Sequence, residues 1–457
     1  LTNKTHMTAQ QLLDKYNVAV PRYTSYPTVP YWDASCPSTG DWKGSVLQAF
    51  GESREISLYL HLPFCEALCT YCGCNKRITK NHAVESPYIE AVLKEWALYR
   101  DLLPGRPILR ELHLGGGTPT FFAPENLHHL LSNILKDVDL AEDYEFGFEA
   151  HPGTTSAEHL STLRDLGFTR LSIGIQDFAP EILEIINRKQ TFEDVRFVTE
   201  KARELGYESI NYDLIFGLPL QTPAHITETI RKTKALAPER IAFYSYAHVP
   251  WISPAQRAYS EDDLPKGKDK RALYELGREL LEEAGYVEIG MDHFALPKDS
   301  LYQAMQEGTL HRSFMGYTPF TTHLNLALGA SSISDSWGAF VQNEKKIERY
   351  QELVNAGELP IVKGHLLTEE DRTLRQHILN VMCRYRTSWA DTGLQCEALY
   401  AGLDRMDELE ADGLIIRRPF ELEVTDIGKP FIRNICMALD ARYWRKKPEG
   451  QLFSQAV

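Results

Sequence analysis

Six apolar, strand-like runs alternate with amphipathic helical segments in the first half of the chain, and this alternation constrains the fold more than any other feature. A strand that is followed by a helix and another strand builds a parallel sheet, and right-handed crossovers curl successive units in one direction. The predicted strands are 56–62, 111–115, 145–150, 170–176, 209–216 and 240–247. We therefore predict an α/β fold, an open, partial (βα)6 barrel whose functional side chains gather at the carboxyl ends of the strands.

The helices between these strands have recognisable beginnings. Ser86 followed by Pro87 predicts one helix start, and Thr191 and Thr222 predict two more. Gly206 is expected to end the helix that follows Thr191. Helices of this length fit the crossovers of a parallel sheet.

The segments on either side of the barrel divide the chain into three predicted parts. Residues 1–54 form an N-terminal arm over the active site, because the prolines in its PRYTSYPT segment favour an extended chain. Residues 55–365 form the main domain, in which 290–295 and 311–317 read as loops. Residues 366–457 begin with a helix capped by Thr368 and continue to a small hairpin, the outline of a mostly helical, winged-helix-like C-terminal domain.

Charge and cysteine content exclude several classes of protein. A net charge of −14 disfavours binding to nucleic acid or to anionic membranes, and no apolar run is long enough to span a bilayer. Four of the eight cysteines fall between Cys65 and Cys74, while Cys36, Cys383, Cys396 and Cys436 are scattered. Such a distribution indicates reduced thiols, so we expect a cytoplasmic protein.

The strongest candidate for chemistry is the loop after the first strand. Cys65, Cys69 and Cys72 have the spacing CxxxCxxC, and Cys74 follows them. Thiolates at this spacing can bind zinc or an iron–sulfur cluster. A structural zinc site needs four ligands, and no distant CxxC completes one, so a 4Fe-4S cluster held by three cysteines, with one iron left open, is favoured over zinc.

Polar residues stand at the ends of the later strands. A Gly115–Gly117 run follows the second strand, Glu149 ends the third, Gln176 the fourth and Asp213 the fifth. Glycines let the backbone approach a ligand, carboxylates can hold ammonium or hydroxyl groups, and Arg188 could grip a carboxylate. Each alone could be structural, but together they favour a binding site. His293 and His311 are read as structural by default.

The cysteine loop, with Tyr71 before its third cysteine, resembles the cluster loop of radical S-adenosylmethionine (SAM) enzymes. Within that superfamily the chain resembles the oxygen-independent coproporphyrinogen III oxidases over nearly its whole length. The segments that carry the resemblance are PRYTSYPT, CEALCTYCGCN, GGGTPT, IGIQDF, INRKQ, NYDLIFGLP, YAHVP, GMDHFA and RNIC. Cys74 and the PRYTSYPT arm resemble this family more than the haem chaperones of the same superfamily, which remain the alternative.

The resemblance implies a set of cofactors and residues. Cys65, Cys69 and Cys72 would ligate one 4Fe-4S cluster, and two SAM molecules are expected. The first SAM would be met by Tyr59, Gly116, Glu149 and Ile333. The second would be met by Tyr71, Gly117, Thr118, Gln176, Arg188, Asp213 and Ala247. No catalytic residue is assigned beyond these.

The resemblance also implies an activity. A 5′-deoxyadenosyl radical would start the oxidative decarboxylation of two propionates of coproporphyrinogen III to vinyl groups, giving protoporphyrinogen IX in haem biosynthesis. A low-potential electron donor is required, and a monomer is expected. The candidate contacts to the substrate's carboxylates are Arg22, Tyr26, Lys76, Arg77 and Arg312. Ser313, Met315 and residues 318–323, which are expected to flank the substrate cavity, depart from the family pattern.

Overall fold

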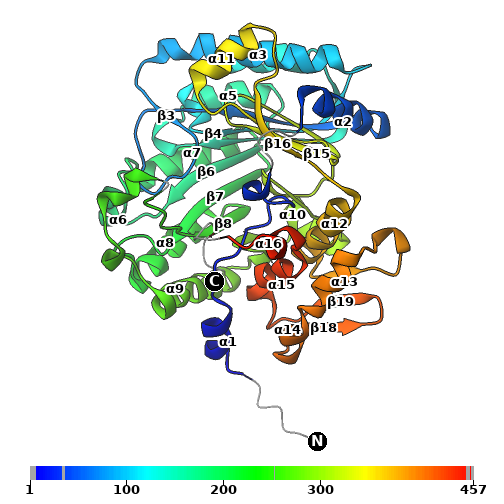
Figure 1. Cartoon of the computed structure of the whole chain (residues 1–457). Coiled ribbons are helices and arrows are strands. Elements are labelled where there is room, and N and C mark those ends of the chain that lie inside the picture. The colour runs from blue at the N-terminus through cyan, green and yellow to red at the C-terminus, as the bar shows by residue number, and fades with distance from the viewer. Residues whose placement is uncertain (1–6, 33–36, 252, 449–452, 454–457) are drawn as a thin grey trace, which may run out of the picture.

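The structure is a computed structural model that describes residues 7–32, 37–251, 253–448 and 453. Cys36 lies outside the described residues. Twelve strands form one sheet in the order β16-β15-β14-β13-β1-β4-β5-β6-β7-β8-β10-β9 (Figure 1). Six of these strands are the predicted ones, β1 (Glu55–Leu62), β4 (Ile108–Gly116), β5 (Asp139–Ala150), β6 (Arg170–Gln176), β7 (Ser209–Phe216) and β8 (Arg240–Ser245). They pair in parallel in chain order, so the predicted open array of six βα units is confirmed.

The sheet extends beyond the predicted array on both sides. β13 (Leu324–Leu328) adds a parallel strand beside β1, with Ile56 opposite Leu324, and antiparallel strands follow outward. These are β14 (Ile333–Asp335), β15 (Ala339–Asn343) and β16 (Ile361–Leu366). On the other side β10 (His293–Ala295) pairs antiparallel with β8 and with β9 (Val287–Gly290).

Two segments that were predicted as loops are therefore strands. Residues 290–295 contribute to β9 and β10, and residues 311–317 form a hairpin of β11 (His311–Ser313) and β12 (Gly316–Thr318). The prediction was wrong because strands of three or four residues are too short to show a period-two pattern. Two further short strands, β2 (Phe64–Cys65) and β3 (Arg77–Ile78), bracket the cysteine loop.

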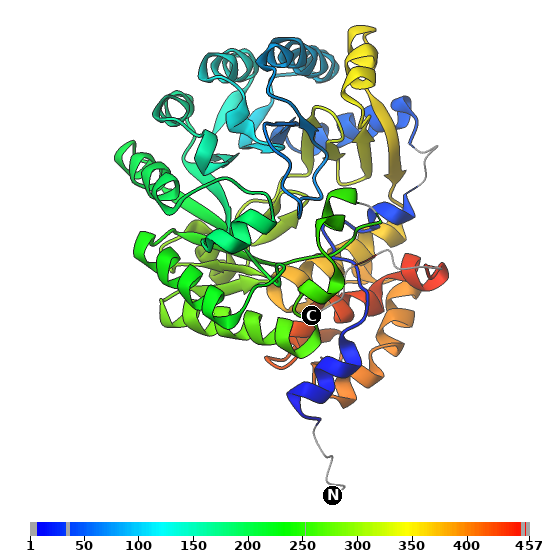
Figure 2. The same cartoon turned by 90° about the vertical axis from the view of Figure 1, so that its left-hand side faces the viewer.

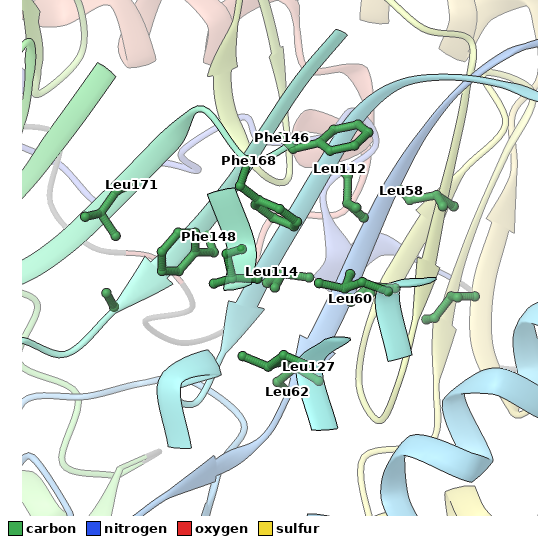
Figure 3. Packing of buried hydrophobic residues seen from close by; sticks show 14 of the residues in the cluster. Leu58, Leu60, Leu62, Leu112, Leu114, Leu127, Phe146, Phe148, Phe168 and Leu171 are labelled. Carbon is green, nitrogen blue, oxygen red and sulfur yellow. The ribbon is translucent and has the colours of Figure 1, made fainter. Parts of the chain in front are cut away.

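Helices cover the outer face of the parallel strands, as Figure 2 shows. They are α3 (Glu85–Leu102), α4 (Pro124–Leu135), α5 (Ala157–Asp165), α7 (Phe192–Glu204), α8 (Pro223–Leu236) and α9 (Gly267–Glu283). The short helix α6 (Pro180–Ile185) lies instead at the carboxyl ends of the strands, where it packs with Leu218 and Tyr246. The elements at the β16 side are α2 (Thr39–Glu52) and α11 (Ile347–Asn355), and α10 (Ser300–Glu307) follows β10. Alternate strand residues such as Leu58, Leu60 and Leu114 pack against these helices (Figure 3), so the intervening residues face the inside of the half-barrel.

Two of the three predicted helix starts are confirmed. Thr191 and Thr222 are the N-caps of α7 and α8, and Leu205 caps the end of α7 with Gly206 next to it at φ +83°. The prediction at Ser86 was wrong, because α3 begins at Glu85. A 3-10 turn, His82–Val84, runs directly into α3, and the buried Glu85 carboxylate accepts a hydrogen bond from the Ala123 amide. The contact of Glu85 with Ala123, far along the chain, therefore determines where α3 begins, and the local capping pattern does not.

A second hydrophobic core joins the N-terminal arm to the C-terminal residues. Tyr16, at the end of α1 (Ala9–Tyr16), Tyr23 and Tyr26 pack with the C-terminal helices in one cluster, and in Figure 1 the arm runs beside α15 and α16. The C-terminal elements are α12 (Glu369–Arg384), β17 (Arg386–Ser388), α13 (Glu397–Asp404), α14 (Asp407–Ala411), β18 (Ile415–Arg418), β19 (Glu421–Val424), α15 (Ile432–Leu439) and α16 (Ala441–Arg445). The predicted helix capped by Thr368 and the predicted hairpin are present as α12 and β18–β19.

Within the described ranges, no helix combines the length and the apolar content that crossing a membrane requires.

Candidate active site

The inner face of the half-barrel is polar near the carboxyl ends of its strands. The Tyr59 ring of β1 stacks on the His113 ring of β4, with the ring centroids 6.1 Å apart. His113 Nε2 lies 3.6 Å from Glu149 Oε1 on β5, and the Tyr59 hydroxyl lies 3.2 Å from Nδ1 of His61. Sequence reasoning found Tyr59 and Glu149 but missed His61 and His113. The alternation of polar and apolar residues along β1 and β4 is the signal that could have found them.

The opposite end of the half-barrel is filled by a network of paired charges. Arg240 donates to Asp299 Oδ1 at 2.6 Å and lies 3.5 Å from Glu145, which also accepts from Arg170. Two arginines thus face two carboxylates, and such pairing offsets the cost of burying each charge. The chemistry is consequently confined to the carboxyl ends of the strands, where the fold class predicts it.

The three candidate cluster ligands lie on the loop between β2 and β3. The Thr118 hydroxyl donates to Cys65 Sγ at 3.4 Å, and Arg188 Nη1 donates to Cys69 Sγ at 3.5 Å. Burial raises the pKa of Cys65 to about 11, whereas a hydrogen bond from the Cys74 thiol lowers the pKa of Cys72. As placed in the described part of the chain, no three Cys, His, Asp or Glu side chains lie close enough together to hold a metal ion.

The chemistry of this donor set fits a 4Fe-4S cluster better than zinc. Three thiols share one short loop, and each has a hydrogen-bond donor beside its sulfur, the environment that sulfur ligands of iron–sulfur clusters use. Metal binding deprotonates cysteine ligands, so Cys65, Cys69 and Cys72 would bind as thiolates.

The glycine-rich loop after β4 lies directly beside the cysteine loop. The Gly117 amide donates to the Leu62 carbonyl at 2.8 Å, and the Thr118 amide donates to the Phe64 carbonyl at 3.0 Å. Gly116 has φ +113°, and a Cβ there would lie 2.6 Å from the His61 ring. A side chain at Gly116 would therefore displace His61 from the inner face.

Arg188 connects the cysteine loop to the end of β6. Its Nη1 also donates to the Tyr71 hydroxyl at 3.3 Å, its Nη2 donates to the Gly174 carbonyl, and its Nε donates to Gln190 at 2.7 Å. Gln176, with φ +71°, is buried beside the same turn. The candidate second-SAM residues Tyr71, Arg188 and Gln176 are therefore brought together.

The remaining SAM candidates are spread along the strand ends. Asp213 accepts from Ser172 at 3.1 Å and from Asn211 at 2.9 Å, and burial, followed by the charge of Glu149, raises its pKa to about 6. Ala247 lies just beyond β8 and lines a large cavity. Ile333, in β14, packs instead against a separate cluster of Trp32, Phe340 and Leu367.

That cavity, of about 1240 Å³, lies between the ends of β7 and β8, helix α9 and the C-terminal elements. Of the five candidate substrate contacts, only Arg22 lines it. Lys76 donates to the carbonyls of Cys72 and Cys74, and Arg77 pairs with Glu348 at 2.8 Å. Tyr26, within the arm, is buried in the cluster that the arm shares with the C-terminal helices, and Arg312 is buried over the Tyr317 ring.

Two basic residues of the cavity wall were missed by sequence reasoning. Lys270 lies in the first turn of α9, where its Nζ donates to the Tyr246 carbonyl at 2.7 Å and burial lowers its pKa to about 8. Arg433 lies in the RNIC segment, which carried only the resemblance. A basic residue one helical turn away from exposed lysines looks the same in the sequence whether it is buried or exposed. Only the elements that pack against α9 decide that Lys270 is buried.

His293 and His311 are the two histidines that the sequence analysis predicts to be structural. His293 Nδ1 contacts the Met291 carbonyl at 2.8 Å, and burial lowers its pKa to about 4. Burial also lowers the pKa of His311, to about 3. Both rings are therefore neutral near pH 7.

Comparison with known proteins agrees with this geometry. The sequence profile of the radical SAM superfamily matches residues 59–233, which include the cysteine loop and the glycine-rich loop. The chain is 37% identical over 456 residues to an oxygen-independent coproporphyrinogen III oxidase of Synechocystis, covering 98% of this chain and 97% of the relative. It is 36% identical over 453 residues to the enzyme of that name from Escherichia coli, covering 98% of each chain.

A solved structure gives the same result in three dimensions. The coproporphyrinogen III oxidase from Escherichia coli, described as a radical SAM enzyme, superposes with a TM-score of 0.87 at 34% identity, over 92% of this chain and 97% of that one. An identity of this level over nearly the full length of both chains is more than a shared fold. The chain therefore belongs to the oxygen-independent coproporphyrinogen III oxidase family of radical SAM enzymes.

Proposed function

We propose that this chain is the radical SAM oxidoreductase that converts coproporphyrinogen III to protoporphyrinogen IX without oxygen, in haem biosynthesis. The observation that carries the proposal is the 37% identity over 456 residues to a relative named for this activity. The cysteine loop and the polar strand ends on one face of the half-barrel support it, because they supply both a redox ligand set and a site for a polar cofactor.

The family implies a 4Fe-4S cluster and SAM. When bound, this pair supplies a 5′-deoxyadenosyl radical, which initiates the loss of carbon dioxide from a propionate. Cys65, Cys69 and Cys72 would hold the cluster, and the hydroxyl of Thr118 and the guanidinium of Arg188 would donate to their sulfurs. Donation to sulfur stabilises the thiolate form and tunes the reduction potential.

We further propose two SAM sites along the strand ends. The first comprises Tyr59, Gly116, Glu149 and Ile333. The second comprises Tyr71, Gly117, Thr118, Gln176, Arg188, Asp213 and Ala247. The proximity of Tyr59, Gly116 and Glu149 supports the first site, and the contact of Arg188 with Tyr71 supports the second. Ile333 has the least support, because its described packing partners lie elsewhere.

The remaining elements of the proposal concern the whole chain. The arm of residues 1–54 covers the site, residues 55–365 carry the chemistry, and residues 366–457 form the winged-helix-like part. A low-potential electron donor supplies electrons to a monomeric enzyme that binds neither nucleic acid nor membrane. A reducing, cytoplasmic compartment is supported by seven free cysteines among the described residues. Arg22, Tyr26, Lys76, Arg77 and Arg312 remain the proposed substrate contacts, and Arg22 has the best support because it lines the cavity.

The test is anaerobic turnover by the reconstituted protein. Purified chain loaded with iron and sulfide, SAM, a chemical reductant and coproporphyrinogen III is expected to yield protoporphyrinogen IX and consume SAM. Cys69→Ser should abolish product and lower bound iron, whereas Cys396→Ser, which also removes one thiol, should retain both, because Cys396 lies at the start of α13. Stable haem binding by a cluster-loaded wild type without vinyl product would instead favour a haem carrier.

A further inference from the structure

Arg312 is a buried cation without an anionic partner. The residue is 5% exposed, and Nε and Nη1 have no hydrogen-bond partner among the residues that the structure describes. Its guanidinium lies over the Tyr317 ring, 4.5 Å from the centroid. A cation–π contact stabilises a desolvated cation by less than it costs to remove an unpaired charge from water.

Two other buried arginines of this chain are paired with carboxylates. Arg240 donates to Asp299 at 2.6 Å, and Arg375 pairs with Asp335. Arg312 has no ion pair in the part of the chain described here, although it is as buried as Arg375. Burying a lone cation is costly, and a single substitution would remove that cost. An unpaired arginine that is present at this position therefore indicates a ligand that brings the missing negative charge.

The surroundings of Arg312 add positive charge. Arg433, also 5% exposed, donates through Nε to the Pro21 carbonyl at 3.0 Å, and Arg22 and Arg312 both act on it electrostatically. Burial, with Arg22 as the next cause, lowers the pKa of Arg433 to about 9. The carboxylate of this group, Asp292, lies 2.5 Å from Arg22 and is committed to it. Arg22, Arg312 and Arg433 thus bring three guanidinium groups close together in a protein whose net charge is −14.

This arginine cluster, Arg22, Arg312 and Arg433, lies close to β8 and β10. Arg22 lies over the Tyr244 ring of β8, and Arg312 acts electrostatically on Tyr244 and on His293 of β10. The cysteine loop follows β1, but Gln256 donates both to the carbonyl of its Tyr71 and to the Ala247 carbonyl just beyond β8, so the loop reaches the carboxyl end of β8.

We propose that Arg312, supported by Arg433 and Arg22, binds a propionate carboxylate that the reaction leaves in place. This inference rests on the proposed function, in which two of the substrate's four carboxylates leave as carbon dioxide and two remain. A buried arginine stabilises the charged carboxylate, and that stabilisation would oppose the loss of the charge during decarboxylation. The cluster therefore suits a carboxylate that the reaction retains.

The test compares the binding of two porphyrins. Coproporphyrin III carries all four carboxylates and protoporphyrin IX carries only the two that are retained, so a retained-carboxylate anchor serves both. In the full chain, Arg312→Gln is expected to weaken the binding of both porphyrins by at least tenfold and by the same factor, measured by the change in porphyrin absorbance on titration. Arg312→Lys should restore part of the affinity, because it restores the charge without the guanidinium fork.

A matched control separates this role from net charge. Arg418→Gln removes the same single charge from the exposed hairpin β18–β19, where Arg418 pairs with Glu423, and should leave both affinities unchanged. A structural role is separated by stability. Arg312→Gln is expected to leave the melting temperature of the ligand-free chain unchanged or raised, whereas Arg375→Gln, which breaks a buried pair, should lower it.

The outcomes that overturn the proposal are distinct. Equal affinities of Arg312→Gln and wild type for both porphyrins would remove the anchor altogether. A loss confined to coproporphyrin III would make Arg312 a partner of a reacting carboxylate. A wild-type chain that binds both porphyrins through Arg312 but makes no vinyl product would refute the proposed function and leave the anchor standing.

Discussion

Individual residues at the strand ends are held in place by contacts that allow little variation. His61 lies between three constraints, because its Nδ1 contacts the Tyr59 hydroxyl, its Nε2 contacts the Asn75 carbonyl at 2.9 Å, and its ring faces Gly116. Burial lowers the pKa of His61, so the neutral ring donates from Nε2 to Asn75 and accepts at Nδ1. The end of the cysteine loop is thereby tied to β1.

Gly116→Ala tests this arrangement. The new Cβ would lie 2.6 Å from the His61 ring, and φ +113° is costly for any residue but glycine. We expect a loss of about 1–3 kcal/mol in the free energy of unfolding and at least a tenfold loss of turnover. Denaturant unfolding and the anaerobic assay measure these, and Gly105→Ala is the control because a Cβ there meets open space. Equal behaviour of the two variants would contradict the argument.

Arg188→Lys tests the link between the cysteine loop and β6. Lysine keeps the charge but cannot reach Cys69, Tyr71, Gly174 and Gln190 simultaneously, as the guanidinium does. We expect SAM affinity to fall at least tenfold, measured by equilibrium binding to the cluster-loaded chain. Arg196→Lys, on the exposed face of α7 and paired with Glu193, is the control. If Arg188→Lys bound SAM with wild-type affinity, the hydrogen-bond donors of the Arg188 guanidinium would have no role in SAM binding.

At the scale of the elements, one buried carboxylate, that of Glu95, fixes helix α3 to the part of the sheet that the sequence did not predict. Glu95 accepts from the Gly329 amide at 2.8 Å and from the Tyr350 hydroxyl at 2.6 Å through Oε2, and from Asn343 at 2.6 Å through Oε1. These partners belong to the β13–β14 turn, to α11 and to β15. One helix residue thus holds together three elements that lie more than two hundred residues away.

The pKa of Glu95 predicts a pH dependence of stability. Burial raises this pKa from 4.5 to about 7. A raised carboxyl pKa contributes stability that is fully present below 4.5 and is lost as the pH rises through 7, because the unfolded state releases its proton more readily. Between pH 6 and pH 8 the free energy of unfolding should fall by about 1 kcal/mol from this group alone.

Glu95→Gln checks that assignment by denaturant unfolding at both pH values. The amide cannot ionise, so the variant should lose the part of the pH 6–8 slope that Glu95 contributes. It should also be less stable by about 1–3 kcal/mol at pH 6, because one amide N–H₂ would face the Asn343 amide donor. An unchanged slope would show that Glu95 does not titrate in this range.

At the scale of the whole molecule, two hydrophobic cores are joined by the N-terminal arm. The first lies between the sheet and its outer helices, and the second combines the arm, residues near β9–β12 and the C-terminal helices. The Tyr23 hydroxyl donates to Asp440 at 3.1 Å, Asn434 donates to the Tyr16 carbonyl at 2.9 Å, and Lys15 pairs with Asp412. The arm is therefore part of the second core, and this holds Arg22 in the cavity wall.

Tyr23→Ala tests whether the arm is integral to the fold. Tyr23 is 2% exposed, so its removal leaves a cavity and takes away the hydrogen bond to Asp440 Oδ2, while the Tyr443 amide still donates to Oδ1. We expect a loss of about 3–5 kcal/mol in stability and faster proteolysis within the arm. Tyr31→Ala, which removes a less buried arm tyrosine bonded to the Lys446 carbonyl, should cost less than about 1 kcal/mol. Comparable losses in the two variants would mean that the arm is held elsewhere.

The sequence by itself determined the six parallel strands, most of their helices and the cysteine loop, because each is specified by local periodicity, capping or spacing. The local pattern is enough to place Glu149 at a strand end, whereas Tyr59, inside β1, came from the family resemblance. Segment resemblance added the family, which the near-full-length relatives confirm.

Only the tertiary structure decided the β13–β16 extension, the burial of Lys270 and the isolation of Arg312. β13 owes its strand to pairing with β1, where Leu324 lies opposite Ile56, a partner far away in the chain. Whether an arginine is paired depends on which carboxylates the fold brings within reach, and that is a property of three-dimensional packing that no local pattern encodes.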